Sequence, residues 1–224
     1  ACDDASQRDR MFMLEALQEG LSRIGAQLQD ATLDELQKRQ AEILINSILC
    51  YLPFAYPSKD TRFEVPQMIH GQWQMVPYKI NPIELTAQRK NIPLFFNDND
   101  RVWAYGLEPQ LEEEEASPWL VFHGTTYPSG PGFTTQLMSD MRPFQTVGHD
   151  LFVSGEEALE SWLKQFPNRK TNVTGVSLGG SLSLLTACRF GDLCGVITAL
   201  NPAGLVENST LKKIDRWNEF KNKA

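Results

Sequence analysis

Apolar residues near the start of the chain recur at helical spacing. Over residues 5–29 they are separated alternately by three and four positions, which places them on one face of a helix: Leu14, Leu17, Leu21, Ile24 and Leu28. Thr32 and Glu35 have the spacing of a capping box, which predicts a second helix to about Leu52, where prolines follow. We expect residues 1–52 to form an N-terminal helical hairpin that covers the main core or, alternatively, docks on a partner or a membrane.

Shorter apolar runs follow the helical region. Residues 53–117 have the composition of irregular β-structure, and "IPLFFN" and "RVWAYGLEP" flank the turn sequence "DND", which predicts a hairpin. The acidic run "LEEEEAS" at 111–117 is typical of a solvated loop. The residues in this part of the chain indicate strands and loops but no functional site.

The pattern after Pro118 alternates between strands and helices. "PWLVFH", "TNVTGV" and "GVITAL" read as short apolar strands, and residues 178–190 as a helix. Ser154 and Glu157 have the spacing of a capping box for a further helix, which Pro167 ends. Strand–helix–strand–helix–strand with short connections predicts an α/β fold with a mostly parallel sheet covered by helices.

Composition narrows the classes of function. The chain has 224 residues, of which 42% are hydrophobic, and a net charge of −7, which argues against nucleic-acid binding because phosphates require clustered cations. No apolar run has the length of a membrane span, and we expect no signal peptide in the sequence as given. The four cysteines form no metal-type pair, and we expect buried free thiols.

The sequence "VTGVSLGGSLSLLTA" at 173–187 holds the strongest chemical signal. "GVSLG" fits G-x-S-x-G and lies between a predicted strand and a predicted helix, where a nucleophile elbow would lie. Side chains at Gly175 and Gly179 would collide with the neighbouring strand and helix. Ser177 is therefore the candidate nucleophile, with the N–H of Leu178 directed at the developing oxyanion. The alternative is a Gly/Ser turn that closes a helix onto a sheet.

A second oxyanion donor is predicted from "VFHGTT" at 121–126. In this stretch an apolar strand ends in His-Gly-Thr about fifty residues before the serine. Gly124 permits a close approach of the loop, and Thr125 can donate through its N–H and its hydroxyl. The alternative is an ordinary turn after a strand.

These stretches together resemble the class 3 (fungal-type) lipases of the α/β-hydrolase superfamily. "VFHGT" is similar to the oxyanion motif Phe-Arg-Gly-Ser/Thr of the family, "VGHDLF" to the segment before its helix, and "VTGVSLGGSLSLL" to its Val-Thr-Gly-His-Ser-Leu-Gly-Gly. The resemblance covers about 118–204. It implies Ser177 as nucleophile and Thr125 with Leu178 as oxyanion hole, while His123 and Val176 depart from the family pattern. Residues 53–224 would then form an α/β-hydrolase-like domain that lacks its C-terminal part.

The loop 127–145 lies where the family places its lid. Its apolar residues could cover an acyl pocket and make transient contact with a membrane surface, with glycines as hinges. A short helix packed on the core is the alternative.

The sequence supplies no obvious general base for the serine. In this superfamily the triad order is Ser, then Asp or Glu, then His, whereas all three histidines here precede Ser177. Three explanations stay open. The acid and histidine belong to a missing segment or a partner chain; the triad is incomplete and the protein only binds ligands or partners; or an upstream histidine serves. His149 is the better upstream candidate, since it would end a strand near the elbow.

The expected function is that of a serine hydrolase acting on carboxylic esters. Lipid acyl esters are the expected substrates, through a Ser177 acyl-enzyme and without a metal or an organic cofactor. The alternative is a catalytically incomplete hydrolase-fold protein that acts as a ligand-binding or partner-binding module. Its Leu-rich N-terminal hairpin would then be the interaction surface.

Overall fold

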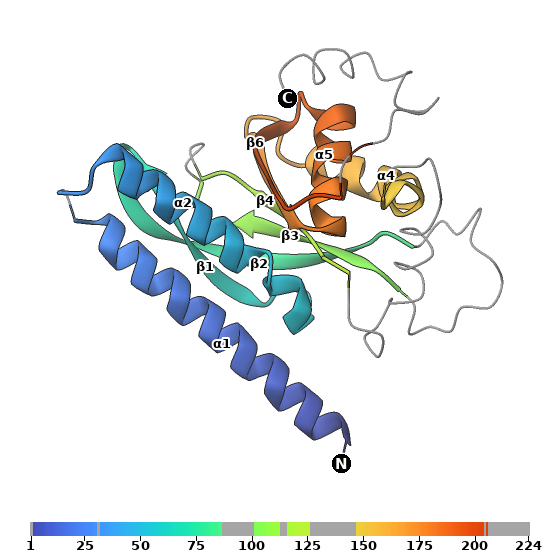
Figure 1. Ribbon diagram of the computed structural model, residues 1–224, viewed down its shortest axis with the longest axis horizontal. Coiled ribbons are helices and arrows are strands. Elements are labelled where there is room, and N and C mark those ends of the chain that lie inside the picture. Colours follow the sequence, from blue (N-terminus) through green and yellow to red (C-terminus); the bar gives the residue numbers. More distant parts are fainter. Residues whose placement is uncertain are drawn as a thin grey trace.

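The computed structural model describes residues 2–30, 32–86, 101–112, 116–125, 147–203 and 205. In this part of the chain a six-stranded sheet carries helices on both of its faces (Figure 1). The strands follow one another in chain order from β1 to β6. The α/β class predicted from the sequence is therefore confirmed.

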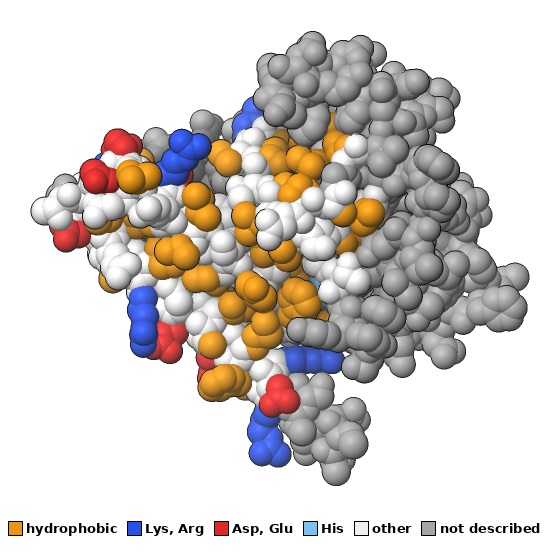
Figure 2. Space-filling view, in the orientation of Figure 1, with side chains coloured by type: hydrophobic (Ala, Val, Ile, Leu, Met, Phe, Trp, Pro, Cys, Tyr) orange, Lys and Arg blue, Asp and Glu red, His pale blue; other side chains and the backbone are white. Residues whose placement is uncertain are grey.

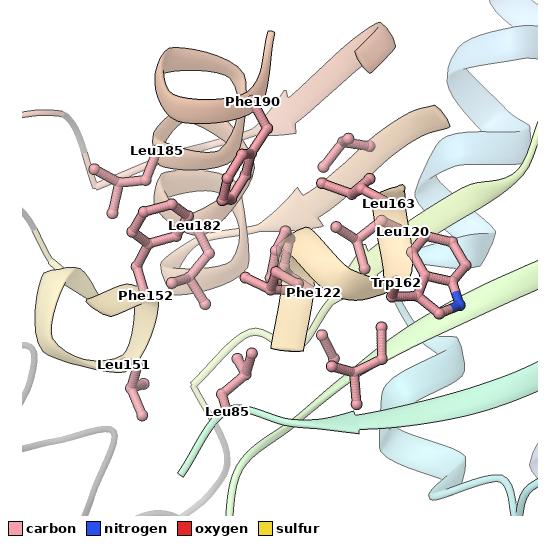
Figure 3. Close-up of a cluster of buried hydrophobic side chains, with 14 of the residues drawn as sticks. Leu85, Leu120, Phe122, Leu151, Phe152, Trp162, Leu163, Leu182, Leu185 and Phe190 are labelled. Atoms are coloured by element: carbon pink, nitrogen blue, oxygen red, sulfur yellow. The ribbon is translucent and has the colours of Figure 1, made fainter. Parts of the chain in front are cut away.

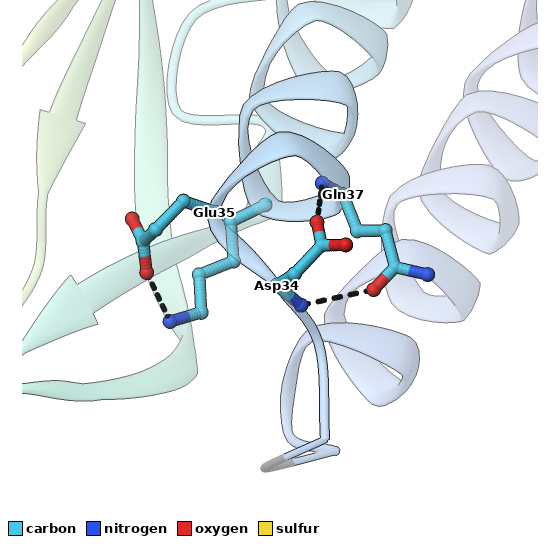
Figure 4. A network of polar contacts seen from close by, with 4 residues as sticks. Asp34, Glu35 and Gln37 are labelled. Atoms are coloured by element: carbon cyan, nitrogen blue, oxygen red, sulfur yellow. Dashed lines mark hydrogen bonds and ion pairs between the residues drawn. The ribbon is translucent and has the colours of Figure 1, made fainter.

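Two helices lie on one face of the sheet. They are α1 (Cys2–Leu28) and α2 (Glu35–Leu49), and the short 3₁₀ helix η1 (Leu52–Ala55) follows them. The two predicted helices are thus present, but the predicted capping box at Thr32 and Glu35 is wrong. Asp34 and Gln37 form it instead. The Asp34 carboxylate accepts a hydrogen bond from the backbone N–H of Gln37, and the side-chain oxygen of Gln37 accepts one from the backbone N–H of Asp34 (Figure 4).

The first half of the sheet is antiparallel. β1 (Arg62–Ile69), β2 (Gln72–Glu84) and β3 (Trp103–Pro109) pair in sequence, and β3 pairs antiparallel with β4 (Trp119–Phe122). β1 alternates between exposed and buried positions at its start and at its end, as expected when one face packs on a core. The proposed "IPLFFN" side of the predicted hairpin lies outside the described residues.

The second half of the sheet is parallel. β4 pairs with β5 (Thr171–Val176) and β5 with β6 (Cys194–Leu200), with α4 (His149–Leu163) and α5 (Leu178–Phe190) as the helices between them. Three of the five strand pairings are antiparallel, so the sheet is mixed, not mostly parallel as predicted. α4 also begins earlier than predicted: its N-cap residue is Gly148, whereas the sequence predicted Ser154 as the cap.

Each face of the sheet has its own hydrophobic core, and strand β4 contributes to both. Leu120 and Phe122 point into the core beneath α4 and α5 (Figure 3), whereas Trp119 and Val121 belong to the core beneath α1 and α2. All four side chains are buried. Successive side chains of a strand point to opposite faces of the sheet, so β4 contributes to both cores. The N-terminal helices therefore pack on the same sheet that carries the candidate serine.

Candidate active site

Ser177 occupies a strained backbone conformation between β5 and α5. Its φ of 56° and ψ of −117° lie outside the regions that L-residues normally adopt. Such strain costs roughly 1–3 kcal/mol and persists only where the surrounding structure enforces it. The Ser177 side chain is nevertheless exposed. The predicted strand–serine–helix turn is present, and its serine can be reached from solvent.

The elbow is held in place by close contacts between backbones. A Cβ atom at Gly175 would overlap the carbonyl group of Gly179, the second residue of α5. A Cβ atom at Gly179 would lie 2.7 Å from the carbonyl oxygen of Phe122, at the end of β4. The steric reason predicted for both glycines is therefore confirmed: only a hydrogen at these positions lets the helix start against two strands.

Hydrogen bonds fix the backbone of the serine itself. The Ser177 amide donates to the carbonyl of Leu200 at the end of β6 (2.9 Å), and the Ser177 carbonyl accepts from the Ser181 amide (3.1 Å). Leu178 is the first residue of α5, where a backbone N–H has no acceptor within the helix. The N-terminus of α5 also carries a partial positive charge. Both features suit a site at which negative charge develops beside Ser177.

The turn at 123–125 lies against the elbow. A Cβ atom at Gly124 would lie 3.1 Å from the carbonyl oxygen of Val176, the residue before the serine. Thr125 follows as a half-buried residue. The structure thus brings the predicted oxyanion turn next to the predicted nucleophile, although the two are separated by about fifty residues of sequence.

Within the part of the chain that the structure describes, the histidines do not complete a catalytic triad. His149 is buried and is the first residue of α4, so the prediction that it ends a strand is wrong. Its neighbour Gly148 does pack against the start of α5, since a Cβ atom there would lie 2.7 Å from Leu178 Cδ1. Among the described residues neither ring nitrogen of His149 has a hydrogen-bond partner, and its Nδ1 lies 3.7 Å from the Asp150 carboxylate. The described residues therefore hold an elbow without a base hydrogen-bonded to Ser177.

The two remaining histidines lie in different settings. His70 is exposed in the turn between β1 and β2, with a left-handed backbone. His123 is buried, and burial lowers its pKa because the charged form loses its solvation. Its Nδ1 contacts the carbonyl oxygen of Gly124, and its Nε2 is buried without a partner within the described residues.

Several predictions concern other parts of the chain. The predicted lid at 127–145 lies outside the described residues. Cys50 and Cys188 are buried free thiols as expected, whereas Cys194 is partly exposed. Burial raises the pKa of both Cys50 and Cys188 to about 11. Across the described ranges no cluster of His, Cys, Asp and Glu is suited to a metal ion, and no helix is long and apolar enough to cross a membrane.

No protein-family model, curated protein or solved structure matches this chain.

The sequence did not predict which side chains pack against the oxyanion turn. The ring centroid of Phe54 lies 4.3 Å from that of His123, and the ring centroid of Tyr56 lies 5.9 Å from it. Both aromatic residues come from the segment around η1, some seventy positions earlier. Nothing in local spacing signals such a contact. The only available hint was the run of aromatic residues and prolines directly after the second helix.

Proposed function

We propose that this protein is a serine hydrolase of the α/β-hydrolase type that cleaves carboxylic esters, with lipid acyl esters as its substrates. The observation that carries the proposal is the strained, exposed Ser177 at the start of α5. Strain of this kind is retained where it serves a function. The resemblance of three motifs to class 3 lipases supports the choice of acyl esters as the substrate class.

The proposed reaction uses three groups around the elbow. The Ser177 hydroxyl attacks the acyl carbon, and the N–H of Leu178 with the N–H and hydroxyl of Thr125 bind the oxyanion. The C–O bond of the ester breaks, the alcohol leaves with a proton, and water then releases the acid from the acyl-enzyme. The elbow and its donors stabilise charge, and a general base takes the proton from the serine hydroxyl.

The base is the unassigned part of this mechanism. His149 is the candidate within the chain, because the turn before it packs against Leu178 and Asp150 lies beside its ring. A histidine supplied by a segment or chain outside the given sequence is the other candidate. The substitution His149→Asn distinguishes these two candidates for the base. It abolishes the reactivity of Ser177 if His149 is the base and leaves it unchanged if another group serves.

Covalent labelling tests the proposed nucleophile directly. A fluorophosphonate should form an adduct on Ser177, located by peptide mass spectrometry, and Ser177→Ala should abolish it. Ser183 offers a matched control on the same helix, since its hydroxyl is buried and donates to the Gly179 carbonyl. An adduct that survives in Ser177→Ala, or no adduct on the wild-type chain, would count against the proposal.

A binding module is the second candidate function, and the surface of the N-terminal helices favours it. Large apolar side chains are exposed there, and Figure 2 shows hydrophobic groups gathered over the face that α1 and α2 form. The exposed side chains of α1, α2 and the turn after α2 are Met11, Phe12, Leu36, Ile43, Leu44 and Tyr51. Exposed apolar groups in this number are typical of a surface that docks on a partner or on lipid. Flotation with phosphatidylcholine vesicles tests this, with Phe12→Ser combined with Leu44→Ser as the variant that should bind less.

A further inference from the structure

The ring of His123 is attached to the backbone of the oxyanion turn. Its Nδ1 lies within hydrogen-bonding distance of the carbonyl oxygen of Gly124. A carbonyl oxygen only accepts, so Nδ1 carries the proton and donates it, and Nε2 is the unprotonated nitrogen of a neutral ring. Burial supports this form, because His123 is only 4% exposed and desolvation disfavours its charged form.

A bond to the Gly124 carbonyl also sets the direction of the next amide. The carbonyl of Gly124 and the N–H of Thr125 belong to one planar peptide unit. In a trans unit these two groups point in opposite directions, and the described residues contain no cis peptide bond. A ring that holds the carbonyl on its own side therefore turns the Thr125 N–H away from itself.

The N-terminal segment holds the ring in place. Phe54 and Tyr56 pack on it from around η1, and the Phe54 ring lies 3.8 Å from the Cβ position of Gly124. The end of α2 is fixed nearby, since Cys50 Sγ lies 3.4 Å from Thr174 Oγ1 on β5, three residues before Ser177. The segment from the end of α2 through η1 thus packs against both the 123–125 turn and the strand that leads to the elbow.

We infer that His123 is a positioning residue: by donating Nδ1–H to the Gly124 carbonyl, it orients the Thr125 N–H as an oxyanion donor beside Ser177. This inference rests on the proposed hydrolase function. The lipase motif has Arg at the position of His123, and the inference gives the histidine at this position a structural role. It also makes the N-terminal segment part of the catalytic architecture, since that segment keeps the ring from rotating.

Three variants separate this role from simple packing. His123→Phe keeps an aromatic ring between Phe54 and the turn but removes the donor. The second-order rate constant for fluorophosphonate labelling of Ser177 should fall roughly tenfold to a hundredfold, since loss of a whole oxyanion donor costs about 10²–10³. His123→Asn places an amide N–H near the position of Nδ1 and should restore most of the rate. Phe54→Leu should give an intermediate loss, because the ring is then less well held.

Two further readouts decide the outcome. The thermal unfolding midpoint of His123→Phe should stay close to that of the wild type, because the lost hydrogen bond to the Gly124 carbonyl is offset by the removal of a buried unpaired nitrogen. ¹⁵N NMR of the wild-type chain should show the proton of His123 on Nδ1. A proton on Nε2, or a His123→Phe variant that labels at the wild-type rate, would overturn the positioning role alone. A wild-type chain that is not labelled at Ser177 would overturn the hydrolase function, and the positioning role with it.

Discussion

The two halves of this sheet are built under different constraints. In the antiparallel half, the left-handed residues His70 and Gly71 lie in the turn that joins β1 to β2, where such backbone conformations are common. In the parallel half, Ser177 has a positive φ outside the regions that L-residues normally adopt and lies between a buried strand and a buried helix, and glycine backbones touch carbonyl groups around it. A Cβ atom added at Gly71 would have no heavy atom within 4 Å, whereas Cβ atoms at Gly175 and Gly179 would meet backbone carbonyl groups, so the candidate site is fixed by backbone contact and the β1–β2 turn is not.

A methyl group at Gly175 should give the largest effect. Its Cβ atom would overlap backbone atoms of Gly179, which cannot move aside as a flexible side chain can. We expect Gly175→Ala to lower the free energy of unfolding by about 3 kcal/mol or more and to abolish labelling of Ser177. Denaturant unfolding measures the first effect.

Gly20→Ala in α1 is the matched control. Its Cβ atom would lie 3.2 Å from the terminal methyl of Ile48, a flexible side chain, and alanine favours a helix over glycine by about 1 kcal/mol. We expect stability to stay equal or rise. Equal losses for the two variants would remove the distinction between the halves.

Removal of the strain at position 177 should stabilise the protein. Glycine adopts a positive φ without steric cost, so Ser177→Gly should raise the free energy of unfolding by about 1 kcal/mol, after the greater entropy of glycine in the unfolded chain is counted. Ser177→Ala keeps the Cβ atom and should stay within about 0.5 kcal/mol of the wild type. A loss of stability in Ser177→Gly would show that the serine conformation carries no strain.

The contribution of His123 should depend on pH in one direction. Its folded pKa is lowered by burial, whereas in the unfolded chain it is about 6.5. The unfolded state thus binds a proton first as the pH falls, so stability is complete above pH ~6.5 and decreases below it. Between pH 7.5 and 5.5 we expect a loss of up to about 1 kcal/mol that His123→Phe removes. Tyr56, which packs on the ring, does not ionise in this interval, because burial raises its pKa. An unchanged slope in the variant would contradict the burial of a neutral His123.

The smallest effect is expected on the outer face of α1. Phe12 is 73% exposed, so Phe12→Ser should change the free energy of unfolding by less than about 0.5 kcal/mol. A larger loss, measured by the same unfolding experiment, would mean that this side chain is covered in solution and that the antiparallel half has a partner there.

Local patterns predicted the elements near the site well. The strand–serine–helix order and the steric role of Gly175 and Gly179 follow from residues adjacent in sequence, and the structure confirms them. Helix starts were harder, because several polar residues compete for the cap: Asp34 caps α2 in place of Thr32, and α4 begins five residues before Ser154. The mixed sheet was missed because the direction of a strand pair depends on contacts between distant segments.

The long-range parts of the site could not be predicted for the same reason. The packing of Phe54 and Tyr56 on His123 joins segments some seventy residues apart, and no periodicity records it. The proximity of the 123–125 turn to the elbow was expected from the strand-end sequence His-Gly-Thr and from the resemblance to a family, and not from any periodicity. His149 was expected to end a strand near the elbow, whereas it is the first residue of α4, and the start of that helix was not predicted correctly.

The most direct measurement of the central claim is the second-order rate constant for fluorophosphonate labelling, with the adduct located by mass spectrometry. If Ser177 is a strained, exposed nucleophile beside two oxyanion donors, the adduct forms on Ser177 alone, disappears in Ser177→Ala, and forms at least tenfold more slowly in His123→Phe. A native, folded chain with no adduct at Ser177 would contradict the account.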